Sequence, residues 1–319
     1  MQRIDVPRDG RENGNFRYEV SAEHPPIATL ELGSPFQLQT LDSYSGRFVR
    51  SADLLDEAFF AKVLPVTGPV AFEGIGAGDW LAVHVRAIQT WEHGTMILRA
   101  GRGLLGRNRT DPPAAYRFDV TAEHAFHPAL GTFTTQPMIG TIWLAPPSGT
   151  RWSGLVGEHA GNIDCPELGL GATIVLPVEV AGAMLYAGDG HAIMGHGELG
   201  GTGIEIGLDL ELAAFKIGGP AVDGTPRLPL IRAADGWLAT IGRGDTLDEA
   251  AMDAVTGLQV WLRHWDCDEP DARIALQGEA RVCQIVNNMY TVAIGLYPHE
   301  HLAAQVDEWL SSTSNSGSA

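Results

Sequence analysis

The chain has 319 residues, of which 45% are hydrophobic, enough to form the core of one large domain or of two ordinary ones. Its formal net charge of −18 repels phosphate backbones, so nucleic acid is not an expected partner. The three cysteines, Cys165, Cys267 and Cys283, have no CxxC spacing, which argues against a disulfide framework or a zinc ribbon and fits a reducing compartment.

The N-terminal residues lack the apolar stretch of a signal peptide, and no apolar run approaches the roughly 18 residues of a membrane span. We therefore expect a cytoplasmic protein that does not contact a membrane. Residues 1–34 combine turn residues with short extended pieces, and the alternation over 36–41 predicts a strand that ends at Asp42. The spacing over 51–63 predicts a helix.

Residues 101–136 are rich in glycine, arginine and proline, which predicts loop. Residues 138–144 predict a strand, and 171–180 predicts an edge strand or a bulge, because Pro177 lacks a backbone N–H. The clearest alternation lies at 204–212, where one face is apolar and the other polar.

The composition changes beyond residue 220. Thr246 and Glu249 predict a capping box at the start of a helix, and a short helix over 272–278, a strand over 291–297 and a final helix over 299–310 are expected next. The sequence thus predicts a mainly β, β-sandwich-like body over 1–220, an α/β C-terminal portion over 221–310 and a disordered tail over 311–319.

Polar residues are concentrated in the segment 154–219, beside glycines that allow positive φ and close backbone approach. Such groups are costly to bury unless they bond to each other or to a metal. The i, i+2 spacings of Asn162 with Asp164 and of Asp189 with His191 place each pair on one face of an extended chain. Imidazole with carboxylate suits zinc or a similar divalent ion, whereas the plainer alternative is a polar network that braces a β turn.

Several segments together resemble the acetamidase/formamidase family along most of the chain. The most specific is EHAGNIDCPELGLGATIVLPVEVAGAMLYAGDGHAIMGHGE at 158–198, which combines a GN-x-D motif with a GDGH…GxGE motif. Further matching segments lie at 38–46, 67–85, 137–146, 202–206, 246–250 and 282–288.

The resemblance implies hydrolysis of a short aliphatic amide, such as formamide or acetamide, to a carboxylate and ammonia by a homo-oligomer, a dimer or larger. The polar residues that match the family are Asp42, Glu73, Asn162, Asp164, Asp189, His191, Glu198 and Glu205, and His159 matches a histidine found in part of the family. Two departures stand out. His196 replaces the usual Asp, and Cys165-Pro166-Glu167 replaces a polar-Lys-Glu step.

This set predicts water activated by a divalent ion, with zinc expected first and calcium or another divalent ion as alternatives. The candidate metal ligands are Asp42, His159, Asp164, Asp189, His191 and Glu205. The candidate catalytic residues are Glu73, Asp164, His191 and Glu198, and the candidate substrate-binding residues are Asn162 and His196.

Other interpretations stay open at this point. Cys165, next to Asp164, could be a nucleophile if its surroundings made it a thiolate, and a non-catalytic protein on the same scaffold could bind a small molecule. Glu205 could be a solvated strand carboxylate and Glu73 a turn acid. His196 could be a replacement ligand, a proton shuttle or a loop histidine.

Overall fold

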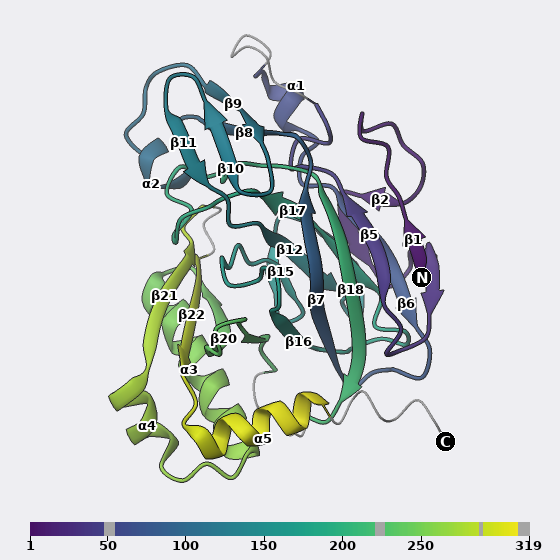
Figure 1. The fold of residues 1–319 in the computed structure, drawn as a ribbon, viewed down its shortest axis with the longest axis vertical. Helices are drawn as coiled ribbons and strands as arrows, with labels where there is room; N and C mark the ends of the chain where they lie inside the picture. Colours follow the sequence, from purple (N-terminus) through teal and green to yellow (C-terminus); the bar gives the residue numbers. More distant parts are fainter. Residues whose placement is uncertain (48–54, 221–226, 287–289, 312–319) are drawn as a thin grey trace.

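The body is built from two large sheets (Figure 1). The computed structural model describes residues 1–47, 55–220, 227–286 and 290–311. In spatial order, the nine-stranded sheet contains β1 (Gln2–Ile4), β5 (Phe36–Thr40), β18 (Leu208–Ile217), β7 (Trp80–Thr90), β16 (Thr173–Pro177), β19 (Leu230–Arg232), β20 (Leu238–Gly244), β22 (Tyr290–Leu296) and β21 (Glu279–Gln284). The seven-stranded sheet contains β14 (Val156–Gly157), β15 (Ala160–Asn162), β12 (Met138–Leu144), β17 (Leu185–His191), β6 (Val66–Phe72) and β2 (Phe16–Arg17), with β4 (Ala28–Leu30) paired to β6.

Two smaller sheets complete the strands among the described residues. One contains β11 (Gly131–Thr134), β10 (His124–His127), β9 (Ala114–Val120) and β8 (His93–Leu98). The other pairs β13 (Thr150–Trp152) with β3 (Glu19–Ser21). Part of the segment that the sequence predicts as loop, 101–136, therefore forms strands.

The main core lies between the two large sheets, and strand β7 shows how the sequence builds it. Leu81, Val83 and Val85 face this core, where they join buried residues of β12 and β17. Trp80 and Ala82 point to the opposite face and pack in a second cluster with helix α3 (Leu247–His264). Alternation with period two thus lets one strand fill an apolar layer on each side of the nine-stranded sheet.

Helices lie mainly in the C-terminal portion, where α3, α4 (Pro270–Gln277) and α5 (Glu300–Ser311) are found (Figure 1). The predicted capping box is confirmed, because the Thr246 side chain accepts the N–H of Glu249 while the Glu249 carboxylate accepts the N–H of Thr246. Elsewhere, α2 (Gly103–Gly106) and α1 (Glu57–Phe60) are single turns. The helix predicted over 51–63 is thus limited, in its described part, to α1, and residues 51–54 lie outside the described residues.

The C-terminal strands continue the nine-stranded sheet, because β19 pairs antiparallel with β16. The prediction of an edge strand or a bulge over 171–180 is therefore wrong, because β16 pairs with β19 and with β7 without a shift of register. Pro177 is tolerated because it is the last residue of β16, and β19 pairs only with Thr173–Val175. The predicted boundary near residue 220 adjoins 221–226, and most of the predicted tail is 312–319; both segments lie outside the described residues. The predicted fold class, mainly β with a helical C-terminal portion, is confirmed.

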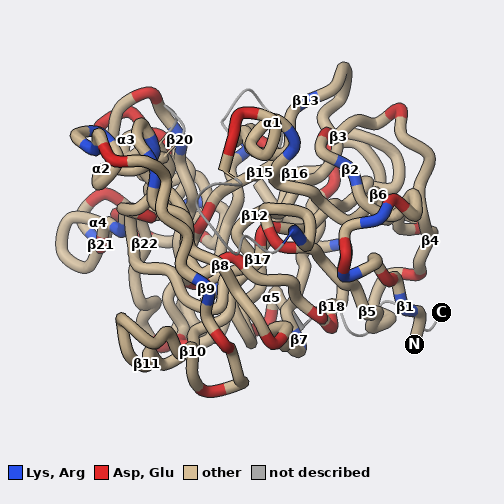
Figure 2. Tube along the Cα trace, turned by 90° about the horizontal axis from the view of Figure 1, so that it is seen from above, with Lys and Arg blue, Asp and Glu red and all other residues tan. Residues whose placement is uncertain are grey.

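Charge is spread over the molecule: Figure 2 shows Asp and Glu positions along most elements, with Lys and Arg positions scattered between them. None of the helices in the described ranges is both long and apolar enough to span a bilayer.

Candidate active site

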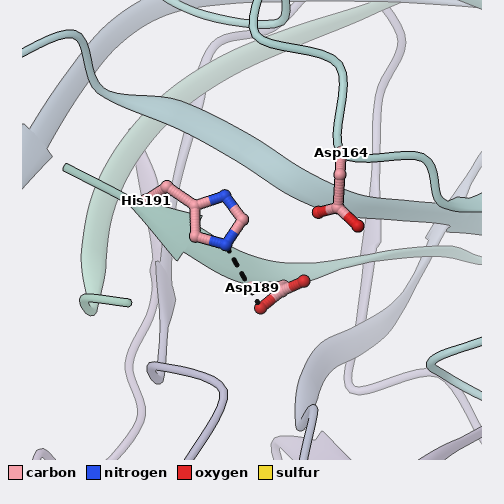
Figure 3. Close-up of side chains that lie close together, drawn as sticks. All are labelled: Asp164, Asp189 and His191. Atoms are coloured by element: carbon pink, nitrogen blue, oxygen red, sulfur yellow. Dashed lines mark ion pairs between the residues drawn. The ribbon is translucent and has the colours of Figure 1, made fainter. Parts of the chain in front are cut away.

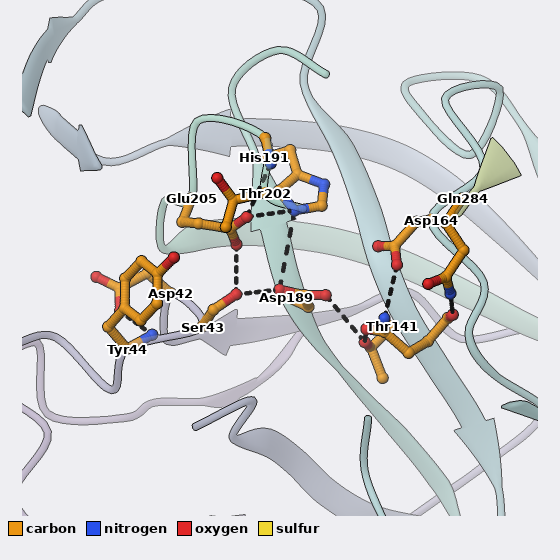
Figure 4. Close-up of polar contacts among 12 residues, drawn as sticks. Asp42, Ser43, Tyr44, Thr141, Asp164, Asp189, His191, Thr202, Glu205 and Gln284 are labelled. Carbon is orange, nitrogen blue, oxygen red and sulfur yellow. Dashed lines mark hydrogen bonds and ion pairs between the residues drawn. The ribbon is translucent and has the colours of Figure 1, made fainter. Parts of the chain in front are cut away.

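The polar residues of the central segment meet at the end of β17 (Figure 4). Strand β12 organises this meeting because it pairs with β15 on one side and with β17 on the other. Thr141 of β12 lies opposite Asn162 of β15 and opposite Gly188 of β17. Backbone bridges then tie Glu205 to His191 and to Thr95 of β8. The GN-x-D and GDGH motifs are therefore brought side by side by a strand that carries neither of them.

Three of the carboxylate residues have an unusual backbone. The φ angles of Asp164, Asp189 and Glu198 are 46°, 56° and 44°, in the left-handed region that non-glycine residues seldom occupy. Each such residue costs about 1–3 kcal/mol and persists only where the surroundings impose it, most often at functional sites. The neighbouring Gly161 and Gly197 also have positive φ, as the sequence suggested, but the acidic residues share this conformation.

The imidazole of His191 lies at the centre of the buried cluster. Its Nε2 is 3.0 Å from Glu205 Oε1 and 3.9 Å from Asp189 Oδ1 (Figures 3 and 4). Asp164, Asp189 and His191 each offer one ligand atom within 4.8 Å of the others, and so do His191, Glu198 and Glu205. All five side chains are buried, so His191 is shared by two groups that could each hold a metal ion.

Two hydroxyl groups that the sequence analysis missed link these acids. Ser43, in the turn after β5, contacts both Asp189 Oδ1 and Glu205 Oε2. Thr141 Oγ1 lies 2.5 Å from Asn162 Oδ1 and 3.3 Å from Asp189 Oδ2, while Asn162 Nδ2 donates to Asp164 Oδ2 at 2.6 Å. The only sequence signal for Ser43 was its place beside Asp42 in the segment 38–46. Nothing in the pattern of β12 distinguished Thr141.

Gln284 is a third residue that the sequence analysis did not single out, although it lies in the family-like segment 282–288. Its side-chain N–H donates to the backbone carbonyl of Asn162. Gln284 belongs to β21, so the C-terminal portion contributes directly to holding the Asn162 loop in place.

Burial dominates the electrostatics of the cluster. It raises the pKa of Asp164 and of Glu198 well above the usual range, and neighbouring carboxylates add to both shifts. Burial together with Glu205 raises the pKa of Asp189 to about 7. Burial opposes the charge on His191, but Glu205 and Asp189 outweigh it and raise the pKa of the imidazole to about 10. A cation placed among these groups would favour the ionised carboxylates.

The arrangement fits a divalent metal ion. Among the described residues, Asp164 Oδ1 and His191 Nδ1 are buried atoms without a hydrogen-bond partner. A Cβ at Gly140 would lie 2.5 Å from Asp164 Oδ1 and 3.0 Å from Asp189 Oδ2, so only glycine leaves the space beside these two carboxylates open. Two carboxylates and one imidazole form a donor set that suits zinc or a similar ion. The buried Asp/His/Glu group could therefore bind a metal.

A small pocket opens onto the cluster. Its cavity volume is about 60 Å³, several times the roughly 10–15 Å³ that one water molecule needs. Polar residues on its wall include Ser43, Asn162, Asp189, Glu198 and Glu205, and the apolar residues include Phe60, Val63, Leu64, Ile97, Trp152 and Val286. A small molecule with a polar end and an apolar body matches these walls.

Four predicted site residues do not belong to the two groups that could hold a metal ion. Asp42 accepts the backbone N–H of Tyr44 and of Gly46, so it caps the turn that carries Ser43, and burial raises its pKa to about 7. Glu73 is exposed in the turn after β6. His159 is partly buried, which lowers its pKa, and the charged groups that act on it include Glu179 and Glu158. His196 is exposed, as described next.

The two departures from the family pattern lie together. His196 Nε2 is 3.3 Å from Glu167 Oε1, and Arg281 Nη1 is 2.8 Å from the same oxygen. Cys165 Sγ contacts the other carboxylate oxygen of Glu167 at 3.1 Å. A contact with the Cys283 thiol, together with burial, raises the pKa of Cys165 well above its usual range. The protonated, buried thiol lacks the thiolate character that a nucleophile needs.

Comparisons with known proteins identify the family of the chain. A model of the Acetamidase/Formamidase family matches residues 149–218. The chain is 30% identical to an acetamidase from Bacillus halodurans, with 93% of this chain and 98% of that chain covered and a TM-score of 0.81. It is 28% identical to a predicted acetamidase/formamidase from the thermophile Thermoanaerobacter tengcongensis, with 92% and 95% covered and a TM-score of 0.82.

The same fold occurs in a gamma lactamase from Delftia acidovorans, which is 17% identical, with 93% of this chain and 92% of that chain covered and a TM-score of 0.67. A comparison with curated proteins found no match. The likeness to the Bacillus halodurans enzyme spans nearly the whole of both chains, and the family model covers the segment from β13 through β18. The chain therefore belongs to the acetamidase/formamidase family and is a hydrolase that acts on amide C–N bonds.

Proposed function

We propose that this enzyme hydrolyses a small aliphatic amide to a carboxylate and ammonia with the help of a divalent ion, zinc being the expected one. The observation that carries the proposal is the convergence of Asp164, Asp189 and His191 within 4.8 Å, beside a small pocket that Asp189 and Glu198 line. The homo-oligomer and the cytoplasmic location implied earlier stay predictions.

Amide hydrolysis needs an activated water, stabilisation of the developing oxyanion and a proton for the leaving nitrogen. Asp164, Asp189 and His191 would hold the ion, which, when bound, polarises the amide carbonyl and lowers the pKa of water. Glu205 orients the His191 ring through its 3.0 Å contact and is itself fixed by the N–H of Gly203 at 3.0 Å. The metal ligands are thus positioned by a second set of hydrogen bonds.

Glu198 is the residue suited to proton transfer. It lines the pocket, and burial raises its pKa well above the usual range of a carboxyl, the direction that makes a carboxylate a stronger base. In this role it accepts a proton from the attacking water and passes one to the amide nitrogen, which departs as ammonia. Asn162 also lines the pocket, and its side chain is fixed between Thr141 and Asp164, so it can orient the substrate amide.

Ammonia release from formamide, acetamide, propionamide and butyramide tests the proposal, with metal analysis of the same protein before and after chelation. We expect turnover of at least one amide, loss of turnover on chelation and recovery when zinc is restored. Undiminished ammonia release by protein shown to be free of metal would refute the role of the ion. Failure on all four amides, with metal bound, would refute the small-amide substrate.

The stability of the metal-free protein should fall as pH rises. The folded-state pKa values of Asp42 and Asp189 are about 7, whereas an unfolded Asp titrates near about 3.9. The folded state therefore binds more protons between about pH 4 and 7, and the free energy of unfolding decreases with pH across this window. The raised pKa of His191, about 10, extends the same trend above about pH 6.5.

Urea unfolding of chelated protein at about pH 5 and pH 8 measures this trend. Asp42→Asn, which keeps an oxygen acceptor for the N–H groups of Tyr44 and Gly46, should make the decline smaller. Zinc should also reduce the decline, because a cation stabilises ionised Asp189. Chelated wild-type protein that is equally stable or more stable at pH 8 would contradict the prediction.

A further inference from the structure

The pocket wall contains an arginine that no carboxylate neutralises within the described ranges. Arg99 follows β8 and is partly buried, and its Cζ lies 3.7 Å from the centroid of the Phe60 ring. Many other arginines of the chain form ion pairs, as Arg86 does with Glu211 at 2.8 Å. Burial lowers the pKa of Arg99, and the second cation Arg102 lowers it further. Arg99 is therefore a partly desolvated cation beside another cation.

Arg99 does not serve to neutralise the acidic cluster. Arg102 is the arginine that lowers the pKa of Glu198, whereas the titratable groups that affect the pKa of Arg99 are Arg102 and Tyr44. A guanidinium stacked on an aromatic ring keeps its edge N–H donors for a planar bidentate partner, typically a carboxylate or a phosphate. A partly buried cation without such a partner is costly, which favours a partner that arrives with the ligand.

The acidic residues of the pocket wall limit what this ligand can be. Asp189, Glu198 and Glu205 also line the pocket and would repel an anion, so a negative group would bind at the arginine and not at these acids. Apolar side chains, including Val63 and Ile97, line the same pocket and suit a short methylene spacer. The pocket thus combines an acidic cluster that can take an amide, an arginine that can take a carboxylate and apolar side chains that suit a spacer.

We propose that the preferred substrate is the monoamide of a short dicarboxylic acid, with its amide at the buried cluster and its carboxylate on Arg99. This inference rests on the proposed amide hydrolysis and names the substrate class. Water adds to the amide carbon, the C–N bond breaks, and the products are the dicarboxylate and ammonia. Arg99 binds the end of the substrate that does not react, so it determines specificity and takes no part in the bond changes.

Succinamate and its neutral isostere 4-methylpentanamide form the test pair, because an isopropyl group replaces the carboxylate at similar shape. With metal-loaded enzyme we expect kcat/KM to favour succinamate by about 10-fold or more, the range for a hydrogen bond to a charged group. Arg99→Gln should remove most of this preference, and Arg99→Lys should retain part of it. Arg86→Gln, which removes an exposed arginine on β7, is the matched control and should preserve the preference.

Direct binding separates this inference from the proposed function. Calorimetry should show that succinate binds wild-type protein more tightly than 4-methylpentanoate does, and that Arg99→Gln removes the difference. If neither amide is cleaved but succinate binding depends on Arg99, small-amide hydrolysis is wrong and the anion site stands. If neutral amides are cleaved but wild-type enzyme shows no preference for succinamate, the inference is wrong and amide hydrolysis stands.

Salt provides a measurement that needs no variant, should Arg99→Gln not fold. Raising the ionic strength should lower kcat/KM for succinamate relative to 4-methylpentanamide, because it screens the attraction between guanidinium and carboxylate. An equal response of the two substrates to salt would count against a charge-based site.

Discussion

Replacing Asp164 or His191 with alanine is expected to lower ammonia release by about 10- to 100-fold or more and to reduce the metal content of the purified protein. Both residues are buried members of the same candidate metal group. Loss of the His191 ring also removes the partner of Glu205, and loss of the Asp164 carboxylate leaves Asn162 Nδ2 without its acceptor. Ammonia assays, metal analysis and circular dichroism on the same samples separate loss of function from loss of folding.

Cys165→Ser is the control for this prediction because it alters the residue next to Asp164. The Cys165 thiol is buried against Glu167 and Cys283, and its pKa is raised, so the substitution should preserve substantial turnover. An inactive Cys165→Ser protein together with an active Asp164→Ala protein would reverse the assignment and indicate a thiol nucleophile.

Gly140→Ala is expected to reduce metal affinity and ammonia release nearly as much as Asp164→Ala does, although it adds a single methyl group and removes no functional group. The new Cβ would lie 2.5 Å from Asp164 Oδ1 and 2.6 Å from the backbone oxygen of Asp189. Because one of these atoms belongs to the backbone of β17, the strand or the Asp164 loop must shift, and the candidate ligands move apart. We expect metal affinity and ammonia release to fall by about 10-fold or more, since catalytic geometry tolerates only small displacements.

Gly195→Ala serves as the matched control for this substitution. Gly195 lies in the family-like segment, yet nothing lies within 4 Å of the Cβ that alanine would add. Its metal content and activity should resemble those of the unmodified enzyme. If Gly140→Ala binds metal and turns over substrate as well as Gly195→Ala does, the space between Asp164 and Asp189 is not the ion site.

The sequence predicted those parts of the fold that local patterns determine. Residues 138–144 form β12 with the expected bounds, and the Thr246 capping box begins α3 where expected. Pro177 favoured an edge strand because a proline cannot donate a backbone hydrogen bond to a neighbouring strand, but whether that bond is needed depends on how far the neighbouring strand extends. The length of the neighbouring strand is a property of the assembled sheet, and the sequence of residues 171–180 does not encode it.

The candidate site was predictable as a set of acids, an imidazole and an amide, because family-like motifs carry Asn162, Asp164, Asp189, His191, Glu198 and Glu205 and the structure brings these six together. Ser43, Thr141 and Arg99 could not be selected, since a single hydroxyl or guanidinium becomes significant only through neighbours that are distant in sequence. His196 shows the opposite error. Its place inside a conspicuous motif suggested a role in the site, but its side chain is exposed and contacts Glu167.

The pairing of the C-terminal strands with the rest of the molecule has a consequence for biosynthesis. Gln284 in β21 and Thr291 in β22 donate side-chain hydrogen bonds to the carbonyls of Asn162 and Ile163. The carbonyl of Cys283 in β21 accepts the N–H of Gly197, and the N–H of Ile285, just after β21, donates to the Gly197 carbonyl. The two loops that carry Asp164 and Glu198 therefore depend on partners that the ribosome supplies much later, 122 and 128 residues later for the bonds to Asn162 and Ile163. A nascent chain can pair β12 with β17 early, but its acidic cluster acquires these last supports only when translation is nearly complete.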